Sequence, residues 1–126
     1  MDERVRRAVL VEDLAGDRRL VEQFLRDADF EVQGFRTAED ALAHLEPSGP
    51  PDLVVVDFML PGMSGLELVT RLRADPRWRR SKILIISAKS DTKSVEAMRG
   101  AGADDYAFKP IDRAEFGGRL SLLGFE

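Results

Sequence analysis

The stretch LVVVDFMLPGMSG, residues 53 to 65, places four apolar residues directly before Asp57 and then a proline and two glycines within eight positions. An unbroken apolar run of this length is typical of a strand that is buried on both faces, as in a parallel sheet covered by helices. Pro61, Gly62 and Gly65 are turn residues. The stretch therefore predicts a buried strand that ends on a carboxylate, and a carboxylate at that place needs a chemical reason.

Further strand patterns lie on both sides of this stretch. The runs AVLV and KILIIS are the clearest, and two weaker candidates are FEVQGF and DDYAFK; they cover residues 8–11, 82–87, 30–35 and 104–109. The segments that separate the strands carry apolar residues at helical spacing. These residues are Leu20, Phe24 and Leu25; Ala38, Ala41, Leu42 and Leu45; Leu66, Leu68, Val69 and Leu72; and those within 95–99 and 114–123.

Regular alternation of strand and helix predicts an open α/β fold, in which a parallel sheet of five strands is covered by helices on both faces. Two irregular segments interrupt the pattern. EPSGPP, residues 46–51, predicts a loop before the third strand. DPRWRRSK, residues 75–82, predicts a solvated loop in which Trp78 covers the third helix.

Composition limits the class of protein. The 126 residues have the length of one ordinary domain, and they contain no cysteine, which excludes disulfides and thiolate metal sites and agrees with a reducing compartment. No apolar run approaches the roughly 20 residues of a spanning helix, and the segment after MDERVRR is too short for a signal peptide. The net charge of −4 disfavours a general nucleic-acid binder. We expect one cytoplasmic domain over residues 1–126, with no membrane or nucleic-acid partner.

Chemically active side chains follow four of the predicted strands. They are Glu12 and Asp13 after the first, Asp57 at the end of the third, Ser87 at the end of the fourth and Lys109 after the fifth. In an open parallel sheet, ligands bind beyond the carboxyl ends of the strands, where the strand order reverses. We therefore expect three carboxylates, a hydroxyl and an ammonium to meet at one edge of the sheet.

Crowded carboxylates repel one another and call for a cation, and oxygen ligands without His or Cys suit Mg²⁺. A site with Mg²⁺, a lysine and a hydroxyl has the parts that phosphoryl transfer requires. Asp57 would be the nucleophile, because a carboxylate can form an aspartyl phosphate, and Glu12 and Asp13 would hold the metal. Singly, each residue has a simpler interpretation: Asp57 could form a turn, and the acidic pair could cap the first helix.

This set of residues resembles the receiver domain of two-component response regulators, including the chemotaxis regulators. The pattern of that family is an acidic pair after the first strand, a phosphoacceptor Asp ending the third, Ser or Thr followed by Ala ending the fourth, and Lys-Pro after the fifth. Here the matching residues are Glu12 and Asp13; Asp57; Ser87 and Ala88; and Lys109 and Pro110. The resemblance covers essentially the whole chain and implies a flavodoxin-like (βα)5 three-layer sandwich with strand order 2-1-3-4-5.

The resemblance also implies a role for each residue. Asp57 is the expected phosphoacceptor, and Glu12, Asp13, Asp57 and the backbone carbonyl of Met59 are the expected Mg²⁺ ligands. Ser87 would bond to the phosphoryl group, Lys109 would pair with it, and Tyr106 would change rotamer with phosphorylation. In receivers the peptide bond that corresponds to Lys109–Pro110 is usually cis.

The expected partner is a histidine kinase or phosphotransfer domain, docked mainly on the first helix, where Asp17, Arg18, Leu20, Val21 and Phe24 are candidates. Phosphorylation would rearrange the surface of the fourth helix, fifth strand and fifth helix and shift binding of a downstream target or fused output domain. GADDY and Arg119 resemble dimer-forming positions in some receivers, so a weak homodimer through that surface is a further hypothesis. Because Met59 offers no polar group to orient an attacking water, we also expect a long-lived phosphoryl group.

The resemblance implies a signalling phosphoacceptor, which catalyses only its own phosphorylation and dephosphorylation. The chain could be a stand-alone receiver or a fragment of a longer regulator or hybrid kinase. A receiver-like binding module that is never phosphorylated would not need all five site residues. A flavodoxin-like or phosphatase-like enzyme would need a glycine-rich phosphate loop after the first strand or a second acid soon after Asp57, and VEDLAGD and FMLPGM provide neither.

Overall fold

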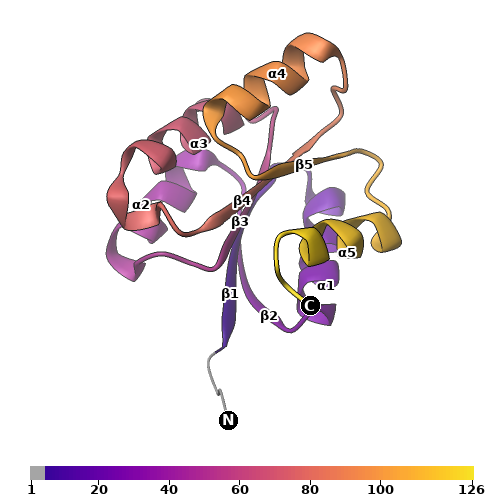
Figure 1. Ribbon diagram of the computed structural model, residues 1–126. Helices are drawn as coiled ribbons and strands as arrows, with labels where there is room; N and C mark the ends of the chain where they lie inside the picture. The colour runs from indigo at the N-terminus through magenta and orange to yellow at the C-terminus, as the bar shows by residue number, and fades with distance from the viewer. Residues whose placement is uncertain (1–4) are drawn as a thin grey trace.

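The computed structural model describes residues 5 to 126 and contains strands that alternate with helices along the chain (Figure 1). The elements, in order, are β1 (Arg6–Val11), α1 (Ala15–Asp27), β2 (Phe30–Phe35), α2 (Ala38–Ser48), β3 (Leu53–Asp57), α3 (Gly65–Ala74), the 3₁₀ turn η1 (Pro76–Trp78), β4 (Lys82–Ser87), α4 (Thr92–Ala101), β5 (Asp105–Phe108) and α5 (Arg113–Leu122). All five predicted strands are present, and the weak candidate 30–35 forms a strand over its full length.

The strands form one parallel sheet in the order β2-β1-β3-β4-β5, which confirms the predicted topology. The chain goes from β1 outward to β2 and then crosses back to β3, so the strand order reverses between β1 and β3. Figure 1 shows α1 and α5 on one side of the sheet and α2, α3 and α4 on the other. The result is the flavodoxin-like three-layer α/β fold.

Two hydrophobic clusters, one on each face, hold the sheet. Successive residues of the central strands alternate between them: Val54 and Val56 belong to the cluster under α2, α3 and α4, whereas Leu53 and Val55 belong to the cluster under α1 and α5. Every residue of β3 is buried. The unbroken apolar run in the sequence is therefore explained by helices that cover both faces.

The N-termini of four helices are capped by side chains. Thr37, Ser64, Asp91 and Asp112 accept hydrogen bonds from backbone N–H groups in the first turns of α2, α3, α4 and α5. Ser64 and Glu67 form a complete capping box at α3. α1 differs, because its N-cap residue Leu14 has no side chain that can accept such a bond.

Three details differ from the sequence predictions. Leu20 is 41% exposed, because the buried stripe of α1 is formed by Val21, Phe24 and Leu25. The predicted loop at 46–51 begins later, since α2 continues through Pro47 to Ser48. A proline removes only one hydrogen bond when it lies this close to a helix end, and Gly49, with φ of 81°, ends the helix.

Trp78 is the third difference. It was expected in a solvated loop, but residues 76–78 form η1 and Trp78 is only 2% exposed. Asp75 caps this turn by accepting a hydrogen bond from the Arg77 N–H. The indole joins the cluster that contains Leu72 of α3, so the expectation that it covers the third helix is confirmed.

Among the helices of residues 5 to 126, none combines the length and the apolar character that crossing a membrane requires.

Arg73 links three separate segments at the end of α3. Its guanidinium donates to the carbonyls of Gly102, Trp78, Arg79 and Ser81 and to the carboxylate of Asp104, at 2.6 to 3.3 Å. The side chain is only 20% exposed. Several backbone carbonyls of η1 and of the α4–β5 turn therefore depend on one cation.

We expect Arg73→Ala to lower the free energy of unfolding by about 2 kcal/mol, because it leaves several of these acceptors without a donor. Urea denaturation followed by circular dichroism measures the change. Arg79→Ala is the matched control: among the described residues the exposed Arg79 side chain makes no hydrogen bond, so its effect should stay within about 0.5 kcal/mol. Equal losses in the two variants would contradict the prediction.

Candidate phosphoacceptor site

Strand register brings the predicted site residues to one edge of the sheet. Val11 pairs with Val56, so Glu12 and Asp57, which follow them, lie side by side at the point where the strand order reverses. On the other side, Ser87 pairs with Phe108, which places Lys109 just beyond the end of β5. Residues far apart in the chain therefore meet because the sheet is parallel and its core fixes the register.

Three carboxylates form a compact group at this edge. Each of Glu12, Asp13 and Asp57 offers an oxygen, and these oxygens all lie within 4.8 Å of one another. Glu12 is 0% exposed and Asp57 is 3% exposed, whereas Asp13 is half-buried. Two buried acids this close together are costly unless a positive charge neutralises them.

Lys109 supplies that positive charge. Its Nζ atom lies 2.8 Å from Glu12 Oε1, 3.0 Å from Asp57 Oδ2 and 3.0 Å from Asp17 Oδ2. Burial by itself would lower the pKa of Lys109, but its close contacts with the carboxylates of Glu12, Asp17 and Asp57 outweigh burial and raise its pKa above the usual value. Lys109 therefore stays charged. The Lys109–Pro110 peptide bond is cis, as the resemblance implied.

Burial makes Glu12 hard to ionise. Burial, followed by a hydrogen bond to the Asp57 carboxylate, raises the pKa of Glu12 to about 7. The pair with Lys109 and the Leu14 N–H, which donates to Oε2 at 3.2 Å, act in the opposite direction. Near neutral pH the site therefore holds a proton on Glu12 for part of the time.

The turn after β3 fixes the Asp57 carboxylate. The Met59 N–H donates to Asp57 Oδ1 at 3.0 Å. Gly65, the first residue of α3, packs against the backbone of Asp57 so closely that a Cβ there would lie 2.2 Å from the Asp57 carbonyl oxygen. Gly62 has φ of 71°, and Glu39 of α2 holds the turn by accepting from the Met63 N–H. The glycines at 62 and 65 are thus required by a left-handed conformation and by a close approach.

Ser87 lies at the same edge but its hydroxyl is occupied by a local turn. Ser87 Oγ accepts from the Lys89 N–H at 2.9 Å and donates to the Lys89 carbonyl at 3.0 Å. The side chain is buried at the end of β4. A hydroxyl that bonds to a neighbouring group at the site would first have to leave this turn.

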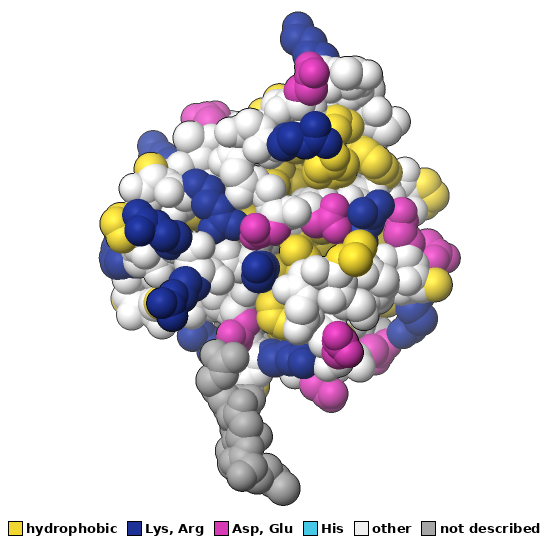
Figure 2. Space-filling view, viewed as in Figure 1, with side chains coloured by type: hydrophobic (Ala, Val, Ile, Leu, Met, Phe, Trp, Pro, Cys, Tyr) yellow, Lys and Arg dark blue, Asp and Glu magenta, His cyan; other side chains and the backbone are white. Residues whose placement is uncertain are grey.

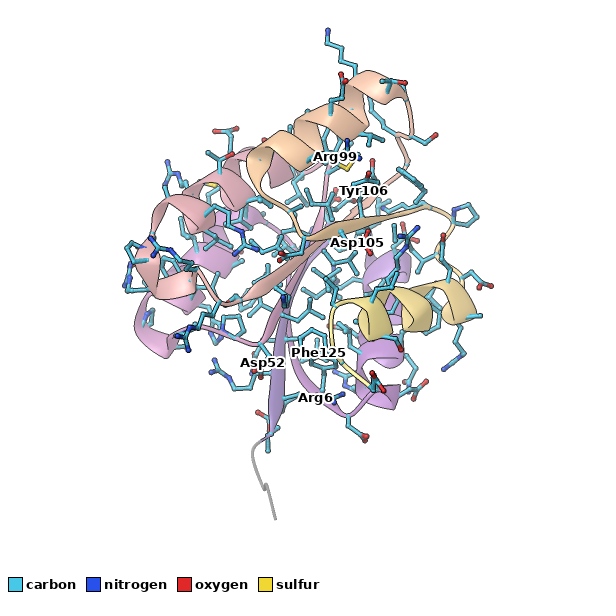
Figure 3. All side chains as sticks on the ribbon, in the orientation of Figure 1. Arg6, Asp52, Arg99, Asp105, Tyr106 and Phe125 are labelled. Atoms are coloured by element: carbon cyan, nitrogen blue, oxygen red, sulfur yellow. The ribbon has the colours of Figure 1, made fainter. Side chains whose placement is uncertain are left out.

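Tyr106 lies farther out, on edge strand β5. Figure 3 shows it close to Arg99 of α4, and the Arg99 Nη2 donates to the Tyr106 hydroxyl at 2.9 Å. Its ring is half-buried and packs against Phe108, with 5.8 Å between ring centroids. On the same strand, Asp105 pairs with Arg119 of α5 at 3.2 Å. Tyr106 is therefore tied to α4 rather than to the carboxylates.

The α1 candidates separate into three groups. Val21 and Phe24 are buried in the core and cannot bind a partner directly, whereas Leu20 is exposed. Arg18 donates to the Glu12 carbonyl at 2.8 Å, and Asp17 contacts Lys109. The contact of Asp17 with Lys109 was not predicted; its place in the turn after the acidic pair was the available signal. Leu14, at 53% exposure, is an additional apolar surface residue that the sequence reasoning missed.

The donor set suits a hard divalent cation. Glu12, Asp13 and Asp57 offer carboxylate oxygens, and Met59 follows Asp57 closely enough in the turn to offer its carbonyl. Glu12 Oε1 is buried and lacks a hydrogen bond of good geometry within residues 5–126, so its 2.8 Å contact with Lys109 is an ion pair. Because no hydrogen bond satisfies this buried oxygen, it can also coordinate a metal cation, and the residues therefore fit one.

Comparison with known proteins agrees with this geometry. The family model for the response regulator receiver domain matches residues 8–121. The chain is 35% identical over 116 residues to the phosphate regulon transcriptional regulatory protein PhoB of Rhizobium meliloti, covering 90% of this chain and 50% of that protein. It is 31% identical over 117 residues to the chemotaxis protein CheY-3 of Vibrio cholerae, covering 91% of this chain and 88% of that one. The chain thus spans about half the length of the first of these relatives.

A solved structure gives a further comparison. The receiver domain of a Pseudomonas aeruginosa sensor histidine kinase superposes with a TM-score of 0.85 at 27% identity, covering 95% of this chain and 98% of that one. That structure is described as having a magnesium ion coordinated in the active site cleft.

Ionisation of Glu12 should make stability depend on pH. Because the folded-state pKa of about 7 lies above the ordinary value of 4.5, the folded protein loses stability as pH rises from 4.5 through 7. Glu12→Gln removes this loss, so without metal it should be more stable than wild type by up to about 3 kcal/mol at pH 8 and by less than about 1 kcal/mol at pH 5. Urea denaturation at both pH values measures this. The exposed Glu96→Gln control should show no such pH-dependent difference; a gain for Glu12→Gln that is equal at both pH values would refute the assignment.

Proposed function

The chain belongs to the response regulator receiver domain family, and we propose that it accepts a phosphoryl group on Asp57 from a histidine kinase or phosphotransfer domain and thereby switches a binding surface. The observation that carries this proposal is the placement of Asp57: its carboxylate is nearly buried, lies in a group of three carboxylates and contacts Lys109 at 3.0 Å. Members of this family are generally phosphoacceptors rather than enzymes, and we propose that this chain catalyses only its own phosphorylation and dephosphorylation.

In the reaction, one carboxylate oxygen of Asp57 attacks the phosphorus of the donor. The new bond to phosphorus forms as the bond to the donor's leaving group breaks, and the leaving group departs with that electron pair. The Met59 N–H keeps the carboxylate oriented through Oδ1. Lys109, which already contacts Oδ2, is placed to pair with the oxygens of the arriving phosphoryl group.

We propose Mg²⁺ as the cation of this site, held by Glu12, Asp13, Asp57 and the Met59 carbonyl. This rests on the all-oxygen donor set and on the magnesium ion coordinated in the related Pseudomonas structure. When bound, it neutralises the charge that the phosphoryl group brings to three carboxylates. Binding needs Glu12 ionised, so the cation competes with the proton on that side chain.

Signal output would follow from two side chains that are held away from the carboxylates. Ser87 would leave its turn with Lys89 and bond to the phosphoryl group, and Tyr106 would give up Arg99 and turn inward. Figure 2 shows hydrophobic side chains gathered between α4 and β5. We propose that the surface of α4, β5 and α5 binds a downstream protein or a fused output domain according to the state of Asp57.

The kinase would dock beside the site on α1, where Leu14 and Leu20 are exposed. We place the whole chain, residues 1–126, in the cytoplasm as one receiver domain without a direct nucleic-acid partner, consistent with its composition.

A homodimer through α4, β5 and α5 remains a prediction; it would have to replace the pair that Asp105 and Arg119 form within one chain. Met59 is 54% exposed and apolar, which supports a long-lived phosphoryl group.

Phosphorylation of Asp57 can be tested by intact mass spectrometry after incubation with acetyl phosphate. We expect one added phosphoryl group that requires Mg²⁺ and is absent from Asp57→Asn, because the substituted amide is not a nucleophile of this kind. Asp52→Asn, a substitution at the opposite end of β3, should still be modified. No adduct under any condition, with a more reactive phosphoramidate donor also tried, would contradict the proposal.

The Tyr106 switch can be followed by NMR, since the chain has a single tyrosine. We expect the ring ¹H–¹³C signals to shift on phosphorylation, and Arg99→Ala alone to move the signals of the unmodified protein part of the way, because it removes the donor that holds the hydroxyl outward. Lys93→Ala, on the same helix and without an ion pair in the described chain, is the control. If the Tyr106 ring signals shift neither on phosphorylation nor in Arg99→Ala, the switch is ruled out.

A further inference from the structure

Asp17 is the third carboxylate on Lys109. Its Nζ atom lies 2.8, 3.0 and 3.0 Å from oxygens of Glu12, Asp57 and Asp17, respectively. The Asp57 contact is a hydrogen bond, and the contacts with Glu12 and Asp17 are ion pairs. Asp17 differs from the other two: it comes from α1 rather than from a strand end, its side chain is 38% exposed, and it is outside the group of oxygens that could hold a cation.

The simpler interpretation is that Asp17 stabilises the start of α1. It lies in the first turn, where a negative charge is favourable, and the N-cap residue Leu14 provides no capping side chain. That role, however, requires only a charge near the helix end. It does not require a carboxylate oxygen 3.0 Å from an ammonium that belongs to the opposite side of the site.

The other two partners of Lys109 have second tasks under the proposed function. Glu12 and Asp57 would turn oxygens toward a cation, and Asp57 would also become the phosphorylated group. Each of these events weakens the hold of that carboxylate on Lys109. Asp17 has no such task among the described contacts, so it can keep the ammonium in place while the others change partners.

We propose that Asp17 is a positioning residue for phosphorylation, which holds the Lys109 ammonium from the α1 side so that it lies beside Asp57 when the phosphoryl group arrives. This inference rests on the proposed function. The advantage is preorganisation. A lysine side chain is long and flexible, and one whose ammonium already contacts Asp57 on one side and Asp17 on the other loses less conformational freedom when it pairs with the phosphoryl oxygens.

The test is a double-mutant cycle on the rate of adduct formation with acetyl phosphate and saturating Mg²⁺. We expect Asp17→Asn to slow the reaction roughly threefold to tenfold, Asp17→Glu to restore part of the rate, and Asp17→Asn to have no further effect in a Lys109→Ala background. Asp40→Asn is the matched control, since Asp40 lies in the first turn of α2 and makes no contact with Lys109. It should leave the rate unchanged.

Three outcomes would overturn the inference: an unchanged or faster rate in Asp17→Asn, an equal effect of Asp40→Asn, or a loss that persists in the Lys109→Ala background. A faster rate would mean that Asp17 chiefly repels the anionic donor. The same cycle on urea denaturation measures the Asp17–Lys109 contact without any reaction. If the wild type forms no adduct, the proposed function fails and the positioning role fails with it, whereas coupling in denaturation without coupling in rate removes the positioning role alone.

Discussion

The ammonium of Lys109 is the charge on which the rest of the site depends. Glu12 and Asp57 are buried beside each other, and two buried acids without a counter-charge would be strongly destabilising or would be protonated. Lys109 reaches both from the end of β5, the short edge strand. The place of β5 in the sheet therefore matters for electrostatics as well as for packing. Lys109 follows the last residue of β5 and has to reach the acids at the ends of β1 and β3.

This requirement explains why so much of the structure fixes geometry around one aspartate. The two hydrophobic clusters hold the register of the central strands, and register sets which residues reach the edge together. At the edge itself, Gly65 lets α3 approach the backbone of Asp57, and the Met59 N–H orients its carboxylate. The carboxylate is thus held by the backbone, while the charges around it are supplied by side chains that can change partners.

The fold could be predicted from the sequence because each clear sequence pattern lies within one short segment of the chain. The run at 53–57 is buried on both faces, so its apolar residues needed no alternation, and the acids after β1 and β3 needed only the parallel topology to meet. The errors arose where a tertiary contact decided the outcome. Trp78 is buried because Asp75 caps a short turn that directs the indole into the core, which composition alone does not indicate.

Side-chain contacts across the sheet were beyond prediction for a similar reason. The sequence places Lys109 at the carboxyl edge and Asp17 on the first helix, but whether they touch depends on how α1 packs beside β1 and how far the lysine extends. The contact of Arg99 with Tyr106 depends likewise on the packing of α4 over β5. Such contacts follow from the distances between elements, and these distances are set by the sizes of many core side chains together.

The carboxylates at the proposed phosphorylation site are more deeply buried than the contact between Arg99 and Tyr106, which would signal the change to a partner. Glu12 and Asp57 are buried, and their arrangement is costly to disturb. The bond from Arg99 to the Tyr106 hydroxyl lies at an exposed site, and a hydrogen bond of this kind contributes only about 0.5 to 1.5 kcal/mol. A ligand can shift a two-state equilibrium only by its differential affinity for the two states. Under the proposed function, a weak outer contact would therefore allow one phosphoryl group to change the surface. A buried, strongly bonded Tyr106 would resist that change. Under the proposed function, the rigid inner carboxylates and the weakly held outer tyrosine would be complementary parts of one switch.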